Sequence, residues 1–283
     1  MLLLIAVGVL VPLLFMIERF KPLRPLTRSL LARLLVNFVI SMFAFATATV
    51  LVQPASFAVS HWTSVRRWGI IHAVPMSVGA QFVLSFLLMD LTFYWWHLAN
   101  HRIPLLWRFH NVHHIDPDLD VSTAFRFHFG EVALSTGFRV IQVGLIGLPT
   151  WMFLSYELLF QANTLFHHSN VRLPIRVERL LNLVLVTPRM HGIHHSQIRD
   201  ETNSNYSVVF SWWDRLHRTV RLNIPQKDIV VGVPAYSDQT DNRLWQALVL
   251  PFSPQRDYWR RSDHAVVQRE RTILSGPKSR LAE

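Results

Sequence analysis

Residues 34–53 restrict the fold more than any other feature, because this run (LLVNFVISMFAFATATVLVQ) holds no charged residue over twenty positions. Twenty residues of α-helix extend about 30 Å, the hydrocarbon thickness of a bilayer. Backbone polar groups find no water inside a bilayer, so such a segment crosses it as a helix. We therefore expect a membrane-spanning helix here.

Three further apolar stretches are predicted to belong to the membrane part. Residues 78–96 are nearly as long and carry one charge, Asp90, which is costly in lipid and needs a partner. Residues 1–17 lack the basic leader of a signal peptide, and we interpret them as a retained anchor. Residues 132–166 are broken by the glycine and proline of GLP at 147–149, which predicts a helical hairpin that dips into the membrane.

The net charge of +10 results from 28 Lys and Arg against 18 Asp and Glu. Basic residues crowd the loop at 18–33, whereas the next loop has only Arg66 and Arg67. By the positive-inside tendency the first loop is cytoplasmic, and the histidine-rich segments then emerge on the same side. Because the basic residues flank apolar spans, nucleic-acid binding is disfavoured. The chain has no cysteine, so any metal must be bound by nitrogen and oxygen.

Eight of the fifteen histidines fall into three tight clusters, HLANH, HNVHH and HGIHH, and two more stand in FRFHFGE and FHHSN. Side chains four residues apart lie on one face of a helix, with Cβ atoms about 5–6 Å apart, so two imidazoles can bind one cation. One ion rarely accepts more than six ligands, so eight to ten imidazoles indicate two metal ions. The candidate ligands are His97, His101, His110, His113, His114, His128, His168, His191, His194 and His195.

Local signals place these rings on helices. Thr187 and Pro188 predict a helix start, with the third cluster in the opening turns. Asp90 lies seven residues before His97 on one stripe, so its carboxylate either accepts a hydrogen bond from a ligand imidazole or a basic neighbour, or pairs two helices. No carboxylate stands inside a cluster, which disfavours the HExxH zinc hydrolases and the carboxylate-rich soluble di-iron bundles.

Several motifs resemble, in type and in order along the chain, those of the fatty acid hydroxylase and sterol desaturase superfamily. They cover about residues 80–220 and read D-x3-Y-x2-H-x3-H at 90–101, H-x2-HH at 110–114, R-x-H-x2-E at 126–131, HSN-x-RLP at 168–174 and H-x2-HH at 191–195. NYS at 205–207 and WDRLHRT at 213–219 resemble the family's NYG and WDRLFGT, which we interpret as turn and packing elements. The chain departs from many relatives at Phe129, where they have proline, and at His217 and Arg218, where they have Phe-Gly.

This resemblance implies a histidine-ligated centre of two iron ions that activates O2 to hydroxylate or desaturate an unactivated C–H bond of a lipid. It carries over nine of the ten histidines as ligands, with His128 as a further candidate, and it makes Asp90 and Glu131 candidate catalytic residues. Electrons must come from a separate electron-transfer protein, because the chain shows no dinucleotide fingerprint and no haem-binding domain. Basic residues of the C-terminal half either attract an acidic carrier or rest against anionic lipid headgroups.

We therefore predict an all-α integral membrane protein, placed in a bacterial inner membrane, with a cytoplasmic helical cap that carries the dimetal site. The expected divisions are anchor helices at 1–78, a catalytic core at 79–220 and a peripheral segment with a frayed tail at 221–283. Candidate substrates are a sterol, hopanoid, fatty acyl chain, ether lipid or carotenoid. Two alternatives stay open, namely a membrane metal transport or storage protein and a zinc-dependent lipid hydrolase.

Overall fold

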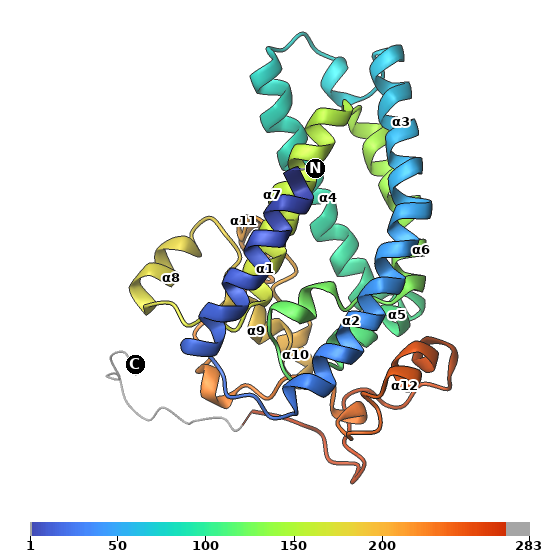
Figure 1. The fold of residues 1–283 in the computed structure, drawn as a ribbon. Coiled ribbons are helices and arrows are strands. Elements are labelled where there is room, and N and C mark those ends of the chain that lie inside the picture. The colour runs from blue at the N-terminus through green and yellow to red at the C-terminus, as the bar shows by residue number, and fades with distance from the viewer. Residues whose placement is uncertain (1, 270–283) are drawn as a thin grey trace.

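The computed structural model describes residues 2–269 and is built from helices (Figure 1). Extended pairing in the described residues is limited to isolated β-bridges, so the predicted all-α class is confirmed. The longer helices are α1 (Leu2–Phe20), α2 (Leu30–Thr47), α3 (Gln53–Arg66), α4 (Val78–Arg102), α5 (Pro104–His114), α6 (Phe129–Ile146) and α7 (Thr150–His168). The shorter ones are α8 (Ile175–Leu181), α9 (Pro188–His194), α10 (Arg199–Thr202), α11 (Trp212–Leu216) and α12 (Leu244–Val249).

The uncharged run at 34–53 lies in one long rod, because a π-helical turn (Ala48–Val52) joins α2 directly to α3. This rod is longer than the predicted span. Its apolar side chains face outward, as Phe38 at 64% and Val50 at 70% exposure show. By length and apolar composition, the rod, α4 and α6 are each able to cross a membrane. An outward apolar surface on helices of this length is typical of lipid-facing segments.

The two helices of the predicted hairpin are α6 and α7, with the break where the sequence places it, whereas its dip into the membrane stays a prediction. Gly147 ends α6 with a φ of +86°, a left-handed conformation that favours glycine, and Pro149 precedes α7. A Cβ at Gly147 would lie 2.2 Å from the carbonyl oxygen of Trp68, so a glycine lets the turn pack against the end of the α3 rod. The hairpin packs between α3, α4 and α1.

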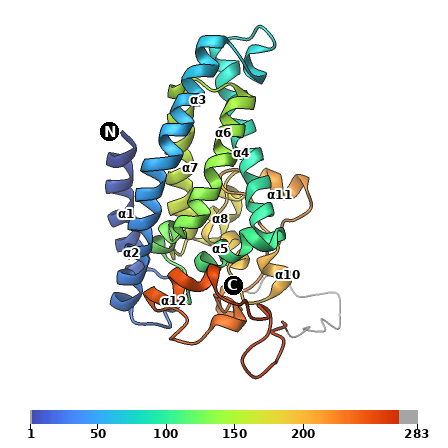
Figure 2. The same cartoon turned by 90° about the vertical axis from the view of Figure 1, so that its right-hand side faces the viewer.

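The short helices and α5 form a cap at one end of the long helices (Figure 2). The cap includes η3 (Val121–Phe125) and η4 (Gln226–Asp228). Residues after 220 also belong to it, since Val233, Tyr236 and Leu250 share a buried cluster with Trp107 and Val112 of α5. The predicted frayed tail from about residue 275 lies outside the described residues. The predicted divisions at 78 and 220 stay predictions.

Candidate metal centre

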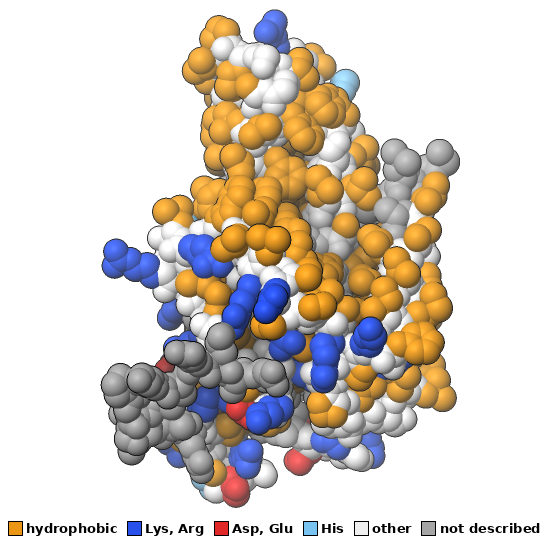
Figure 3. All heavy atoms as spheres, turned by 90° about the vertical axis from the view of Figure 1, so that its left-hand side faces the viewer, with side chains coloured by type: hydrophobic (Ala, Val, Ile, Leu, Met, Phe, Trp, Pro, Cys, Tyr) orange, Lys and Arg blue, Asp and Glu red, His pale blue; other side chains and the backbone are white. Residues whose placement is uncertain are grey.

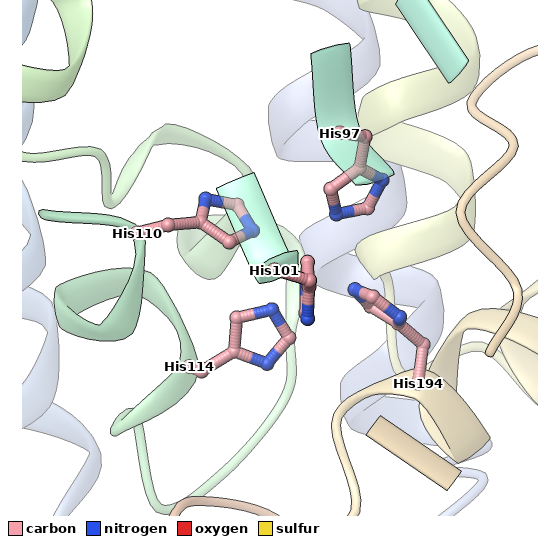
Figure 4. Close-up of side chains that lie close together, drawn as sticks. All are labelled: His97, His101, His110, His114 and His194. Carbon is pink, nitrogen blue, oxygen red and sulfur yellow. The ribbon is translucent and has the colours of Figure 1, made fainter. Parts of the chain in front are cut away.

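Two groups of buried imidazoles converge where α4, α5, α7 and α9 meet in the cap. In each group the potential ligand atoms lie within 4.8 Å of one another. Site A, whose rings point toward one another in Figure 4, comprises His97, His101, His110, His114 and His194. Site B comprises His113, His168, His191 and His195. The structure thus brings together nine of the ten predicted ligands.

Helical periodicity explains how each HxxHH cluster serves both sites. On α5, His110 and His114 are four residues apart and face site A, whereas His113 faces site B. On α9 the division is reversed, because His191 and the following His195 face site B and His194 faces site A. The two sites are therefore adjacent. The rings of His114 and His195 stack with centroids 4.4 Å apart.

Four imidazoles are oriented by a hydrogen bond at Nδ1, which turns Nε2 toward the centre. In three of them Nδ1 lies against a backbone carbonyl: His97 against Tyr206 (2.7 Å), His194 against Ser204 (2.7 Å) and His168 against Thr164 (2.8 Å). In the fourth, Nδ1 of His110 lies 2.8 Å from Oε1 of Glu131. Metal-binding histidines usually make this kind of outer hydrogen bond, because it fixes the tautomer and the ring orientation.

In site B the Nε2 atoms crowd one point. Nε2 of His191 lies 2.9 Å from Nε2 of His168 and 3.0 Å from Nε2 of His195. Nε2 of His168 also lies 3.1 Å from Nε2 of His113. Two nitrogens at right angles, each about 2.1 Å from one ion, are about 3 Å apart. The spacing therefore fits imidazoles that share a cation.

In site A several buried ring nitrogens lack a hydrogen-bond partner. Among the described residues, buried nitrogens without a hydrogen-bond partner include Nε2 of His110 and of His194 and both nitrogens of His101 and His114. A buried polar atom without a partner costs about 1–3 kcal/mol. A metal ion at this point would give one nitrogen of each of these rings a partner.

Burial lowers the pKa of His114, His194 and His195. Burial and the neighbouring imidazoles hold the pKa of His114 and of His195 well below the ordinary value. Burial also lowers the pKa of His194 to about 3, although the hydrogen bond to the Ser204 carbonyl acts in the opposite direction. A lowered pKa favours the neutral imidazole at these three positions, and a metal ligand requires the lone pair of the neutral ring.

Glu131 and Asp90 have different environments. Glu131 lies in the first turn of α6 and holds Nδ1 of His110. The Asp90 carboxylate does not hold a ligand imidazole, because its oxygens accept from the backbone N–H groups of Val209 and Phe210 and from Nε1 of Trp213. Of the two roles considered for Asp90, the structure shows the pairing of two helices, because its hydrogen bond to Trp213 joins α4 to α11. These hydrogen bonds also hold the segment whose Tyr206 carbonyl orients His97.

His128 lies outside both sites, unlike its predicted role as a ligand. Its Nδ1 accepts from the Gly130 N–H as the N-cap of α6, and its Nε2 lies 3.0 Å from the Leu248 carbonyl oxygen. Sequence reasoning also missed His167. Its ring centroid lies 4.2 Å from that of His191, and the signal was the doubled histidine in FHHSN.

A buried ion-pair network holds the turn that follows the HNVHH cluster. Arg33 of α2 binds both oxygens of Asp116 (2.8 and 3.0 Å) and one oxygen of Asp120 (2.9 Å). Burial alone would raise the pKa of Asp116, but the charges of Arg33 and Arg126 outweigh it and hold the pKa at about 2. Arg33 thereby attaches the α2–α3 rod to Asp116, which lies two residues after His114.

The end of α1 and its connection to α2 contact the chain near His168 and the HGIHH cluster. Glu18 accepts from the backbone N–H of Asn170, two residues after His168 (2.8 Å). The Arg24 guanidinium lies against Gly192 in the third cluster, where a Cβ would be 2.2 Å from Nη1. A side chain at position 192 would have to displace this guanidinium. Residues 18–37 thus contact the chain next to His114, next to His168 and within the HGIHH cluster.

Residues 82–219 match the fatty acid hydroxylase family. The ornithine lipid hydroxylase OlsE of Rhizobium tropici is 34% identical over 175 residues, which cover 62% of this chain and 49% of that protein. Human alkylglycerol monooxygenase is 30% identical over 148 residues (48% of this chain, 29% of that protein), and mouse cholesterol 25-hydroxylase is 27% identical over 141 residues (49% and 46%). No solved structure matches the chain.

The chain spans about half or less of the length of these curated relatives. The family match nevertheless contains every histidine of sites A and B. It also contains Glu131 and Asp90, which position site residues. The predicted family is thus confirmed over the segment that builds the centre. Through residues 82–219, this chain is similar to the fatty acid hydroxylase family.

Proposed function

We propose that the chain is a membrane-bound hydroxylase that uses two iron ions and O2 to hydroxylate a C–H bond of a membrane lipid. The observation that carries this proposal is the pair of adjacent, buried, all-nitrogen sites on a family scaffold. The named relatives support the reaction class, since they hydroxylate an ornithine lipid or cholesterol or act as an alkylglycerol monooxygenase.

The proposed ligands are the nine histidines of sites A and B, and His128 is left out because its ring nitrogens are used elsewhere. Two bound iron ions would supply the oxidising chemistry. The chain contributes neutral imidazoles, held by carbonyls and by Glu131, and a buried setting that keeps bulk water away. Glu131 and Asp90 then act as positioning residues.

The overall reaction consumes the lipid, O2, two electrons and two protons and yields the hydroxylated lipid and water. The electrons come from a separate donor that docks on the cap, as the sequence analysis predicts. We place the cap on the cytoplasmic side of a bacterial inner membrane, because the loop at 18–33 is rich in basic residues. Residues 79–220 form the catalytic core in this proposal.

The test is lipid analysis under 18O2. Purified protein in vesicles of its host's lipids is incubated with NAD(P)H and a ferredoxin–reductase system, and lipids are compared by mass spectrometry. We expect one lipid class to gain one 18O atom, only when both O2 and reductant are present. Lipid cleavage without O2 would instead support the zinc hydrolase. Metal ions that move across the vesicle membrane without lipid oxidation would support the transporter.

A further inference from the structure

One flank of the cap carries apolar side chains on its outside. We call it the α8–α11 patch, and its exposed side chains are Ile175 (43%), Val177 (46%), Leu180 (68%), Leu183 (58%), Trp212 (40%) and Leu216 (66%). The two helices are joined into one surface. Nε1 of Trp212 donates to the Leu183 carbonyl (2.8 Å), and Nη2 of Arg215 donates to both Asn182 oxygens (2.9 and 3.0 Å).

Helix α8 has reversed polarity for a helix on a water-exposed surface. Its sequence is IRVERLL, and its buried residue is the acidic one, Glu178, which is 2% exposed. Glu178 is held inside by the backbone N–H and Nε of Arg189 (2.8 and 2.7 Å). Ile175, Val177 and Leu180 are left exposed, and Leu181 is half-buried. A helix that buries its carboxylate and exposes its aliphatic residues is suited to an apolar environment.

Arginines border the same patch. Arg172, Arg176, Arg179, Arg215 and Arg218 are exposed. Within residues 2–269, Arg176, Arg179 and Arg218 make no salt bridge. On this side of the molecule, basic side chains gather where the apolar surface of the long helices gives way to the cap (Figure 3). Apolar residues beside arginine at this level match the boundary between acyl chains and headgroups.

We infer that the α8–α11 patch is an interfacial platform that inserts its apolar side chains into the leaflet, while its arginines bind anionic lipid headgroups. A second copy or a soluble protein is disfavoured as the occupant, because this face of the molecule also carries the apolar surface of the long helices (Figure 3). The third histidine cluster lies in the chain between α8 and α11. The platform therefore holds sites A and B at headgroup depth, within reach of a membrane lipid.

The absence of cysteine allows a direct test. Leu180→Cys and Leu216→Cys, each labelled with bimane, are reconstituted in vesicles of phosphatidylcholine and phosphatidylglycerol (3:1). Gln239→Cys, an exposed polar position after η5 (Pro234–Tyr236), is the matched control. We expect a shallow nitroxide lipid to quench the two patch positions at least about threefold more than the control, and aqueous iodide to show the reverse order.

Two results would overturn the inference. Equal iodide quenching at all three positions would show that the patch faces water, and protection from both quenchers would show that protein covers it. The headgroup contact is tested with the triple change Arg176→Gln, Arg179→Gln and Arg218→Gln. We expect phosphatidylglycerol to strengthen nitroxide quenching at Leu180 about twofold, and this dependence to vanish in the triple variant. If quenching at position 180 does not depend on phosphatidylglycerol while the three arginines are present, the proposed headgroup contact is refuted. None of these readouts depends on the proposed hydroxylase activity.

Discussion

Replacing Arg33 by alanine should destabilise the protein and empty the metal centre, although Arg33 touches no histidine. Its guanidinium is 5% exposed and neutralises Asp116 and Asp120, whose side chains are fully buried. Removing one partner of a buried ion pair leaves an uncompensated charge and costs about 3–5 kcal/mol. Arg19 still contacts Asp120 at 2.8 Å, so most of the loss falls on Asp116.

The assay is thermal unfolding in detergent, followed by size-exclusion chromatography, together with metal analysis. For a chain of this size, about 3–5 kcal/mol corresponds to a decrease in midpoint of roughly 10 °C. Because Asp116 lies two residues after His114, we expect metal content to fall as well. Arg66→Ala, at the exposed far end of the α2–α3 rod, is the control and should change neither quantity.

A double-mutant cycle separates the ion pair from general damage. Asp116→Asn in the Arg33→Met background removes the unpaired charge, so the double variant should be more stable than Arg33→Met alone. Arg33→Lys keeps the charge but loses the two-point contact, and its stability should lie between those of Arg33→Ala and the parent. An Arg33→Ala variant with the parental midpoint and metal content would refute the argument that this network braces the centre.

Three further predictions concern the site. Glu131→Gln should weaken metal binding about 10–100-fold, measured by competition with a chelator, because the neutral amide holds Nδ1 of His110 less firmly. Asp90→Asn should cost about 1.5–3 kcal/mol of stability through weaker hydrogen bonds to the 209–213 segment, and an unchanged melting midpoint would contradict this. His128→Ala should leave the metal content unchanged and lower the stability by about 1 kcal/mol through the lost N-cap, whereas His114→Ala should lower the metal content. Equal metal loss in both variants would show that His128 is a ligand.

Local patterns predicted the helices and the ligand clusters because both follow from short-range geometry. The uncharged run at 34–53 and the break at 147–149 are visible as composition, and spacing of three or four residues places rings on one helix face. The division of each HxxHH cluster between two sites was not predicted. Periodicity separates one ring of each cluster from the other two, but which rings of α5 and α9 share a site depends on how the fold places the two helices.

Long-range pairing accounts for most of what the sequence analysis missed. Arg33 and Asp116 are 83 residues apart, and nothing in either segment indicates the other as a partner. Asp90 was correctly identified as needing a partner, yet its partners are backbone N–H groups near residue 210, which carry no sequence signal. His128 looked like a ligand because its motif resembles the family's, whereas its ring caps a helix.

Iron stoichiometry tests the central claim most directly. Protein purified from iron-replete cells is analysed for iron by mass spectrometry against chain concentration from amino-acid analysis. The two sites predict about two iron ions per chain, and the pair His101→Ala and His114→Ala, which touches site A alone, should leave about one. A single ion in the parent protein, or two ions that survive removal of both His191 and His195 from site B, would contradict the two-metal centre.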